Sequence, residues 1–125
     1  MSPTLRSAFH NELQAGRLRR AAGDLDAAFK HFERAHILGQ RDTLAHVRAH
    51  ALMLGVGWER RDSRELVAQL VRFVAALMFS RIWVPVGNTG GANVSAFRAM
   101  DIPDDLAAIL REASAETTKV DSPLN

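Results

Sequence analysis

The sequence predicts an all-α protein: a compact bundle of about five helices with a glycine-rich loop before the last helix. Apolar residues recur at three- and four-residue steps in several segments, which is typical of helices with one buried face. Capping residues, glycines and prolines separate these segments, and no polar–apolar alternation is long enough to indicate a sheet. With 125 residues, the chain is long enough for one domain that folds around its own core.

The first two helices are marked by strong start and stop signals. Ser2 and Pro3 are typical of an N-cap and a first helical position, and the helix they begin is expected to end near Ala22. Gly23 ends it. A second helix then begins after Asp24, which acts as its N-cap, and it ends at Gly39. The apolar positions of both helices keep helical spacing: Leu5, Ala8, Phe9, Leu13 and Leu18, then Leu25, Ala28, Phe29, Phe32 and Ala35.

Two more helices are expected in the middle of the chain. A third begins at Asp42 or the next residue, and Gly55 to Gly57 are expected to loosen its end. After a short polar link, a fourth and longer helix begins at Asp62 or the next residue and runs to about Trp83. Because this helix is apolar over most of its surface, we expect it at the centre of the bundle.

The C-terminal third contains a loop and one further helix. Residues 85–95 (PVGNTGGANVS) are too rich in glycine and asparagine for a helix or a central strand. Pro103 and the two carboxylates after it begin the last helix, where the helix dipole favours negative charge. We expect residues 1–116 to form a single helical domain and residues 117–125 to form a flexible tail.

Composition excludes several kinds of site. The chain has no cysteine, so disulfides, thiolate nucleophiles and cysteine-ligated metals are excluded, and any metal must bind nitrogen or oxygen. The net charge is only +2, and the absence of tyrosine and cysteine inflates the pI, so no nucleic-acid partner is expected. We find no secretory signal, and polar residues interrupt the most apolar run, which predicts a cytoplasmic protein without a membrane partner.

One stretch follows the pattern of a known repeat. Gly16 in the first helix, and Ala28, Phe32 and Ala35 in the second, occupy positions where tetratricopeptide repeats place small and aromatic residues. Over about residues 9–40 the chain therefore resembles a tetratricopeptide-like hairpin, and residues 43–77 resemble a degenerate second copy. The resemblance implies antiparallel helical hairpins and a protein or peptide partner. Because three full repeats are missing, we expect a compact domain rather than an open solenoid.

A wider resemblance covers nearly the whole chain. It rests on Glu12, on AHILGQ at residues 35–40, on the His46 and His50 pair, and on GNTGG at residues 87–91. Together these motifs are similar to a small uncharacterised bacterial domain family. This resemblance implies a helical fold and no particular chemistry.

Four residues are candidates for a metal site: Glu12, His36, His46 and His50. His46 and His50 are four residues apart, so they share one face of a helix. On the geometry that the repeat resemblance implies, Glu12 and His36 face the same interior. Buried imidazoles and carboxylates are costly unless a partner or a cation satisfies them. This ligand set suits a divalent transition metal, namely zinc, iron, copper or nickel.

The alternative is a structural polar cluster. In that case His50 donates a hydrogen bond to a backbone carbonyl, and Glu12 pairs with Arg48 or an N-terminal arginine. His36 caps the C-terminal end of its helix, where the helix dipole favours a cation. His10 and His31 are expected at the surface under either hypothesis.

The glycine-rich loop holds a second candidate site. Backbone N–H groups of successive glycines can bind an anion, and Asn88 and Thr89 add side-chain donors for a cofactor. The loop lacks the lysine and the spacing of a phosphate-binding loop. The alternative is a structural loop that covers the bundle.

Two functions therefore stay open. The first is a small cytoplasmic metal-binding protein that uses the glutamate and the three histidines. The second is a tetratricopeptide-like adaptor for another protein, with the histidines structural. The chain has no nucleophile elbow and no nucleotide fingerprint, so whether it is an enzyme is left open. Trp58 and the apolar fourth helix add a homodimer as a further alternative.

Overall fold

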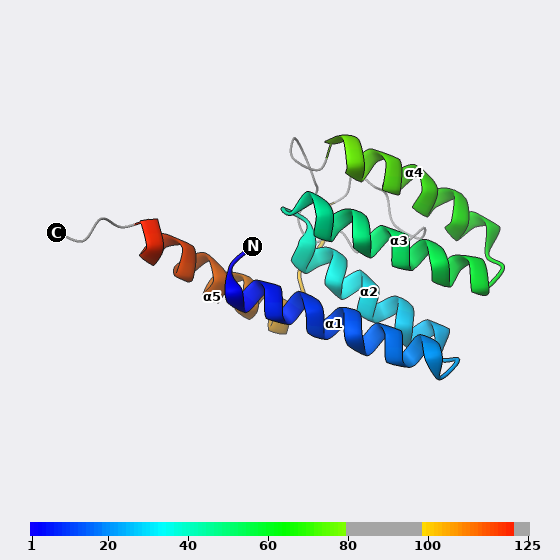
Figure 1. Ribbon diagram of the computed structural model, residues 1–125, viewed down its shortest axis with the longest axis horizontal. Helices are drawn as coiled ribbons and strands as arrows, with labels where there is room; N and C mark the ends of the chain where they lie inside the picture. Colours follow the sequence, from blue (N-terminus) through cyan, green and yellow to red (C-terminus); the bar gives the residue numbers. More distant parts are fainter. Residues whose placement is uncertain (80–98, 122–125) are drawn as a thin grey trace.

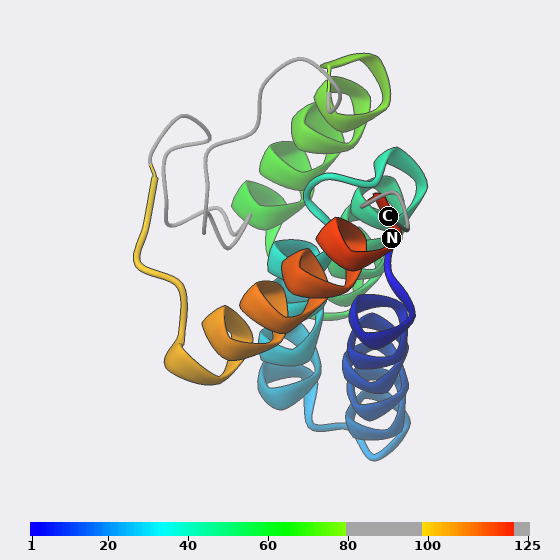
Figure 2. The same ribbon diagram turned by 90° about the vertical axis from the view of Figure 1, so that its left-hand side faces the viewer.

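The computed structural model describes residues 1–79 and 99–121, and all regular secondary structure within them is helical. The five helices are α1 (Pro3–Ala21), α2 (Leu25–Gly39), α3 (Thr43–Glu59), α4 (Ser63–Phe79) and α5 (Asp104–Asp121). Helices α1 to α4 lie side by side in chain order (Figure 1), and α5 packs at an angle against α1 and α2 (Figure 2). This arrangement confirms the predicted compact all-α bundle.

The helices begin where the sequence places their caps. The side-chain oxygens of Ser2, Asp24, Asp42 and Asp62 each accept a hydrogen bond from the backbone N–H three residues later. Each cap satisfies an N–H group that the first turn of a helix leaves without a partner. Between α1 and α2 the chain turns at Gly23, whose φ of 79° is in the left-handed region that favours glycine.

Helix α2 is central and packs against both α1 and α3. Its Phe32 is fully buried and lies directly over Gly16 of α1. A methyl group added at Gly16 would be 2.4 Å from Cε1 of Phe32, so any side chain there would push the two helices apart. This contact explains the glycine in α1, while the tetratricopeptide resemblance stays a prediction.

The prediction that α3 loosens at its glycines is wrong, because the helix continues through Gly55 and Gly57 to Glu59. Both glycines lie where another element comes close. A methyl group at Gly55 would be 3.1 Å from Nη2 of Arg20, and one at Gly57 would be 3.2 Å from Cγ of Glu65. These glycines make room for neighbouring side chains, and the helix ends two residues later.

Helix α4 packs on α3 at the edge of the bundle, so its predicted central position is wrong. Its buried side includes the polar residues Glu65 and Gln69. Large apolar residues on the same helix are instead exposed: Val67, Leu70, Val71, Val74 and Met78. Among the described residues, no helix has both the length and the apolar character needed to cross a membrane.

Helix α5 is longer than expected. We predicted a tail from residue 117, whereas the helix continues to Asp121. The hydroxyls of Thr117 and Thr118 each donate to a carbonyl four residues earlier, and Glu116 accepts a hydrogen bond from Thr4 of α1. The predicted glycine-rich loop, with Asn88 and Thr89, lies outside the described residues, as does the predicted end of the fourth helix.

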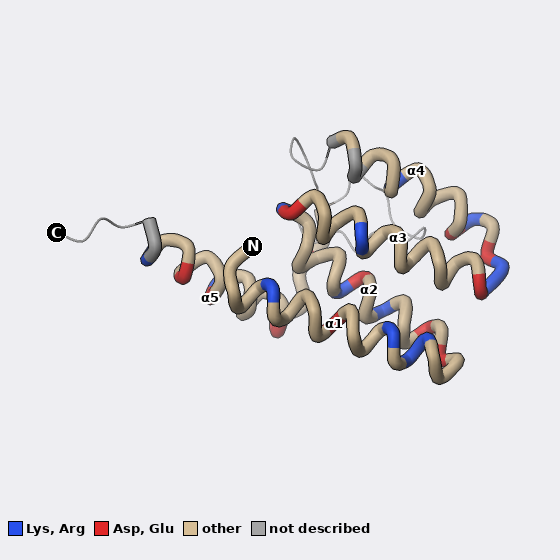
Figure 3. Tube along the Cα trace, in the orientation of Figure 1, with Lys and Arg blue, Asp and Glu red and all other residues tan. Residues whose placement is uncertain are grey.

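Charged residues gather at the turns that join α1 to α2 and α3 to α4 (Figure 3). Arg20 donates to Glu59 at 2.8 Å through Nε, and Arg60 donates to Asp26 at 2.6 Å. The guanidinium of Arg60 also lies 4.8 Å from the ring centroid of Phe29. Arg20 and Arg60 therefore link the two hairpins. Ion pairs this exposed contribute little to stability.

Candidate metal centre

Three histidines from two helices turn their imidazole rings toward one another. Nε2 of His46 lies 2.7 Å from Nε2 of His36 and 3.2 Å from Nε2 of His50. One nitrogen from each ring lies within 4.8 Å of the other two. The three residues are only 2% to 5% exposed. The structure thus brings together three of the four residues that the sequence predicts for a metal site.

The short turn between α2 and α3 creates this arrangement. His36 lies in the last turn of α2, and His46 and His50 lie one turn apart in α3. Gly39 lies where α2 approaches α3: a methyl group there would be 3.0 Å from Cβ of Ala45. Because this position has no side chain, the end of α2 can lie close to α3 and bring the rings together.

Glu12, the fourth predicted ligand, lies elsewhere, and this expectation is corrected. Its carboxylate is 2.7 Å from Nδ1 of His31 and 2.7 Å from Nε of Arg34. Arg34 also pairs with Asp105 of α5, and this hydrogen bond is the largest cause of the raised pKa of Arg34. The partner of Glu12 is therefore Arg34 rather than Arg48 or an N-terminal arginine. His31, which we expected at the surface, is half-buried in this network.

Helix α4 contributes two residues that the sequence analysis did not identify. Oε1 of Gln69 lies 2.8 Å from Nδ1 of His50, and Nε2 of Gln69 donates to Oε1 of Glu65 at 2.5 Å. Gln69 is completely buried and Glu65 is 5% exposed. The available signal was two polar residues four positions apart on a largely apolar helix, which places them on one face.

Burial keeps two of the three histidines, His46 and His50, neutral. It lowers the pKa of His46 to about 4, and repulsion from His50 when that ring is protonated is the second cause. Burial also lowers the pKa of His50 to about 4; the hydrogen bond with Gln69 opposes this shift and the charge of Arg72 adds to it. Both rings are therefore neutral at pH 7, the state in which an imidazole nitrogen can bind a metal.

The rings lie close to the spacing that a metal bound by three imidazoles requires. Ligand nitrogens around a tetrahedral zinc ion, each 2.0–2.1 Å from the metal, are about 3.3 Å apart. The separation of 3.2 Å between His46 and His50 meets this requirement. The 2.7 Å contact between His36 and His46 would have to lengthen by about 0.6 Å, which is within reach of small side-chain rotations.

A metal would also bind all three facing nitrogens at once. A neutral imidazole has one N–H and one lone pair, so the three facing nitrogens cannot all donate to one another. Nε2 of His46 is shared by two contacts, and its Nδ1 makes no hydrogen bond within the part of the chain that the structure describes. In the neutral cluster these nitrogens have to share hydrogens or lone pairs, whereas a bound cation would attract a lone pair from each ring.

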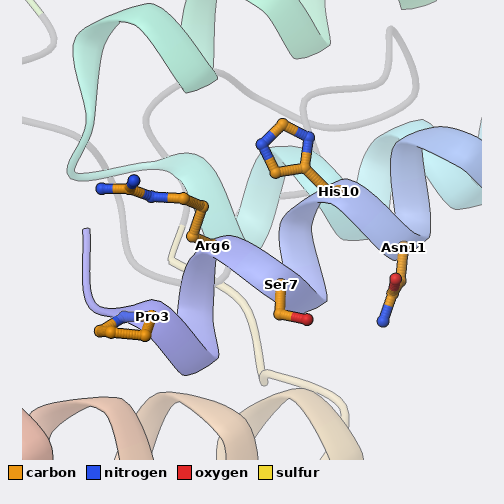
Figure 4. Close-up of a pocket in the computed structure, with 5 residues that line it drawn as sticks. All are labelled: Pro3, Arg6, Ser7, His10 and Asn11. Atoms are coloured by element: carbon orange, nitrogen blue, oxygen red, sulfur yellow. The ribbon is translucent and has the colours of Figure 1, made fainter.

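A separate hollow of about 470 Å³ lies on α1 and contains none of these residues. Its lining comes from a single helix, as Figure 4 shows: Pro3, Arg6, Ser7, His10 and Asn11. His10 is exposed there, as the sequence predicted. Because none of the three buried histidines lines this hollow, it is not part of the candidate metal centre.

Comparison with known proteins identifies one family. Residues 3–110 match a family model described as a protein of unknown function, DUF3703, and this range includes the three histidines, Glu65 and Gln69. No curated protein and no solved structure gives a significant match. The match agrees with the predicted resemblance to a small uncharacterised family. The bacterial origin of that family, its motifs and the tetratricopeptide resemblance stay predictions.

Proposed function

The chain belongs to the DUF3703 family, whose description gives no function, and we propose that it is a small metal-binding protein. His36, His46 and His50 would each contribute Nε2 to one divalent transition metal. The observation that carries the proposal is the convergence of three buried imidazoles, two of which have strongly lowered pKa values.

A purely structural cluster explains the same residues less well. Apolar side chains of similar volume would pack the interface between α2 and α3 without a desolvation cost. Nδ1 of His46 is buried, and no described residue is its hydrogen-bond partner. Such a group destabilises a fold by about 1–3 kcal/mol. Three buried imidazoles that lower the stability of the fold are explained if they bind a metal.

The ligand chemistry narrows the metal. Imidazole nitrogens suit zinc, iron, copper and nickel, whereas copper(I) and iron–sulfur clusters prefer sulfur, and the chain has no cysteine. Three protein ligands would leave one position on a tetrahedral metal for water or another small ligand. A metal site with three protein ligands and one open position is compatible with a sensor, a metal chaperone or a metalloenzyme. A cytoplasmic location stays a prediction.

Zinc titration of untagged, chelator-stripped protein tests the proposal. We expect one zinc ion per chain by elemental analysis, with an affinity measured by competition against a chromogenic chelator. His46→Leu removes a ligand and fills its space with hydrocarbon, so the affinity should fall at least 100-fold. The matched control is His10→Leu, which removes an exposed histidine from α1 and should leave the affinity unchanged.

Two results would contradict the proposal. In the first, zinc, copper, nickel and iron(II) all fail to bind at one equivalent per chain. In the second, His46→Leu and His50→Leu bind the metal as tightly as the unaltered chain. In either case the histidines would be structural.

A second candidate is the protein-interaction module that the tetratricopeptide resemblance implies. Its supporting observation is the apolar surface of α4, where Val67, Val71 and Met78 are each more than 60% exposed. Exposed apolar patches often mark interaction sites. If that surface joins two copies of the chain, sedimentation will give a dimer mass, and Val67→Asp with Val71→Asp will reduce it to a monomer. A monomer at all concentrations would exclude the homodimer.

A further inference from the structure

We propose that Glu65 and Gln69 are positioning residues of the metal centre: Glu65 orients the amide of Gln69, which holds His50 in the tautomer whose Nε2 lone pair faces the centre. The consequence for metal binding rests on the proposed function. The tautomer itself is a property of the metal-free chain, so it can be tested separately.

The orientation of the Gln69 amide follows from its neighbour. A carboxylate offers only acceptor atoms, so the amide nitrogen must face Glu65. The distance of 2.5 Å between Nε2 of Gln69 and Oε1 of Glu65 agrees with a charge-assisted hydrogen bond. The reverse orientation would bring the amide oxygen against a carboxylate oxygen in a buried site. Oε1 of Gln69 therefore faces His50.

The tautomer of His50 follows from the amide. Oε1 of Gln69 accepts a hydrogen bond, so Nδ1 of His50 at 2.8 Å must carry the hydrogen. A neutral imidazole has only one N–H, which leaves Nε2 with a lone pair. This is the nitrogen that lies 3.2 Å from Nε2 of His46. The chain from Glu65 to His50 thus directs a metal-binding lone pair toward the other histidines.

Helix α3 makes room for this arrangement. Gly57 lies against Glu65, and a methyl group there would be only 3.2 Å from Cγ of the glutamate. Gly57 also lies in the same helix as His50, two turns later. The missing side chain lets the buried carboxylate lie against α3, within reach of Gln69. Gly57 therefore contributes to the site by leaving space for Glu65.

Such second-layer partners usually change metal affinity 10- to 100-fold when they are removed. They act by fixing the ring orientation and tautomer of a ligand. The amide of Gln69 lies between the carboxylate of Glu65 and the imidazole of His50. It therefore fixes the orientation of the ring without bringing the negative charge into contact with it. We expect Gln69 and Glu65 to affect metal affinity through His50 and not by touching the metal.

The first experiment measures the tautomer in metal-stripped protein. Long-range ¹H–¹⁵N correlation NMR at pH 7 should show His50 as the Nδ1–H tautomer, with His50→Leu identifying its signals. In Glu65→Gln an amide faces the Gln69 amide, so both orientations become allowed and His50 should populate the Nε2–H tautomer as well. The matched control is Glu112→Gln, the same chemical change at an exposed position of α5, which should change nothing.

The exchanged pair Glu65→Gln with Gln69→Glu is the rescue. The carboxylate at position 69 would accept from Nδ1 of His50 and from the new amide at position 65, so the Nδ1–H tautomer should return. Zinc affinity should fall 10- to 100-fold in Glu65→Gln and in Gln69→Leu, and it should recover in the exchanged pair. A merely structural role for Glu65 would not produce this rescue.

Two outcomes separate the two claims. An Nε2–H tautomer of His50 in the unaltered chain, or an unchanged tautomer in Glu65→Gln, would overturn this inference whether or not zinc binds. The expected tautomers without zinc binding would overturn the proposed function and leave the positioning of His50 established.

Discussion

The two helical hairpins, α1 with α2 and α3 with α4, are built alike and filled differently. Between α1 and α2 the contact is apolar, with Phe32 packed over Gly16, and the polar network around Glu12 lies toward the edge. Between α3 and α4 the buried groups include His50, Gln69 and Glu65, and apolar residues of α4 face outward. The second hairpin thus places polar groups inside and apolar groups outside, which stability does not favour. Such departures from a well-packed core are expected at functional sites.

The largest expected effect tests the polar hairpin with acid. Between about pH 6.5 and pH 4, unfolded histidines bind protons, whereas buried His46 and His50, with pKa values lowered to about 4, do not. The unfolded state therefore binds more protons, and the free energy of unfolding of metal-stripped protein should fall as pH falls through this window. The loss is on the order of 3 kcal/mol per histidine, and it should level off below pH 4.

Urea unfolding across this pH range measures the effect. The double variant His46→Leu and His50→Leu should lose most of the dependence, while His10→Leu should keep it. A pH-independent stability in the unaltered chain would contradict the neutral, buried state of the two rings and would make the two hairpins alike.

A somewhat smaller effect is expected from the apolar hairpin. Phe32→Ala removes a fully buried ring between α1 and α2, which should lower the free energy of unfolding by about 3–5 kcal/mol at every pH. Chemical denaturation at pH 7 and pH 5 measures it. The control Leu18→Ala, at an exposed position of the same hairpin, should change stability by less than about 0.5 kcal/mol. If Phe32→Ala lowers the free energy of unfolding more at pH 5 than at pH 7, the interiors of the two hairpins are energetically coupled.

The smallest of these effects comes from the metal itself. Zinc at 100 times its dissociation constant should raise the free energy of unfolding by about 2.7 kcal/mol, because it binds only the folded chain. Thermal unfolding with and without zinc measures this gain. It should vanish in His46→Leu and persist in Leu18→Ala. Equal stabilisation of both variants would mean that zinc binds outside the histidine cluster.

Local signals predicted much of the fold. The caps Ser2, Asp24 and Asp42 act within three residues of themselves, so the starts of α1, α2 and α3 could be found without any tertiary contact. The convergence of His46 and His50 was accessible for the same reason, because helical spacing alone places them on one face. The local sequence around Gly55 and Gly57 wrongly predicts a loosened helix end, because their neighbours, Arg20 and Glu65, come from other helices.

The sequence by itself determined the helical class, most of the helix starts and the presence of a histidine-rich face, since these depend on residues within one turn of each other. Only the tertiary structure decided which groups complete the site. The sequence pattern places Glu12 with the histidines, yet Arg34 and His31 of α2 bind its carboxylate. Gln69 and Glu65 complete the site because the packing of α4 on α3 turns their face inward. Which partner a buried polar group meets depends on how helices pack across the core, and no spacing along one helix contains that information.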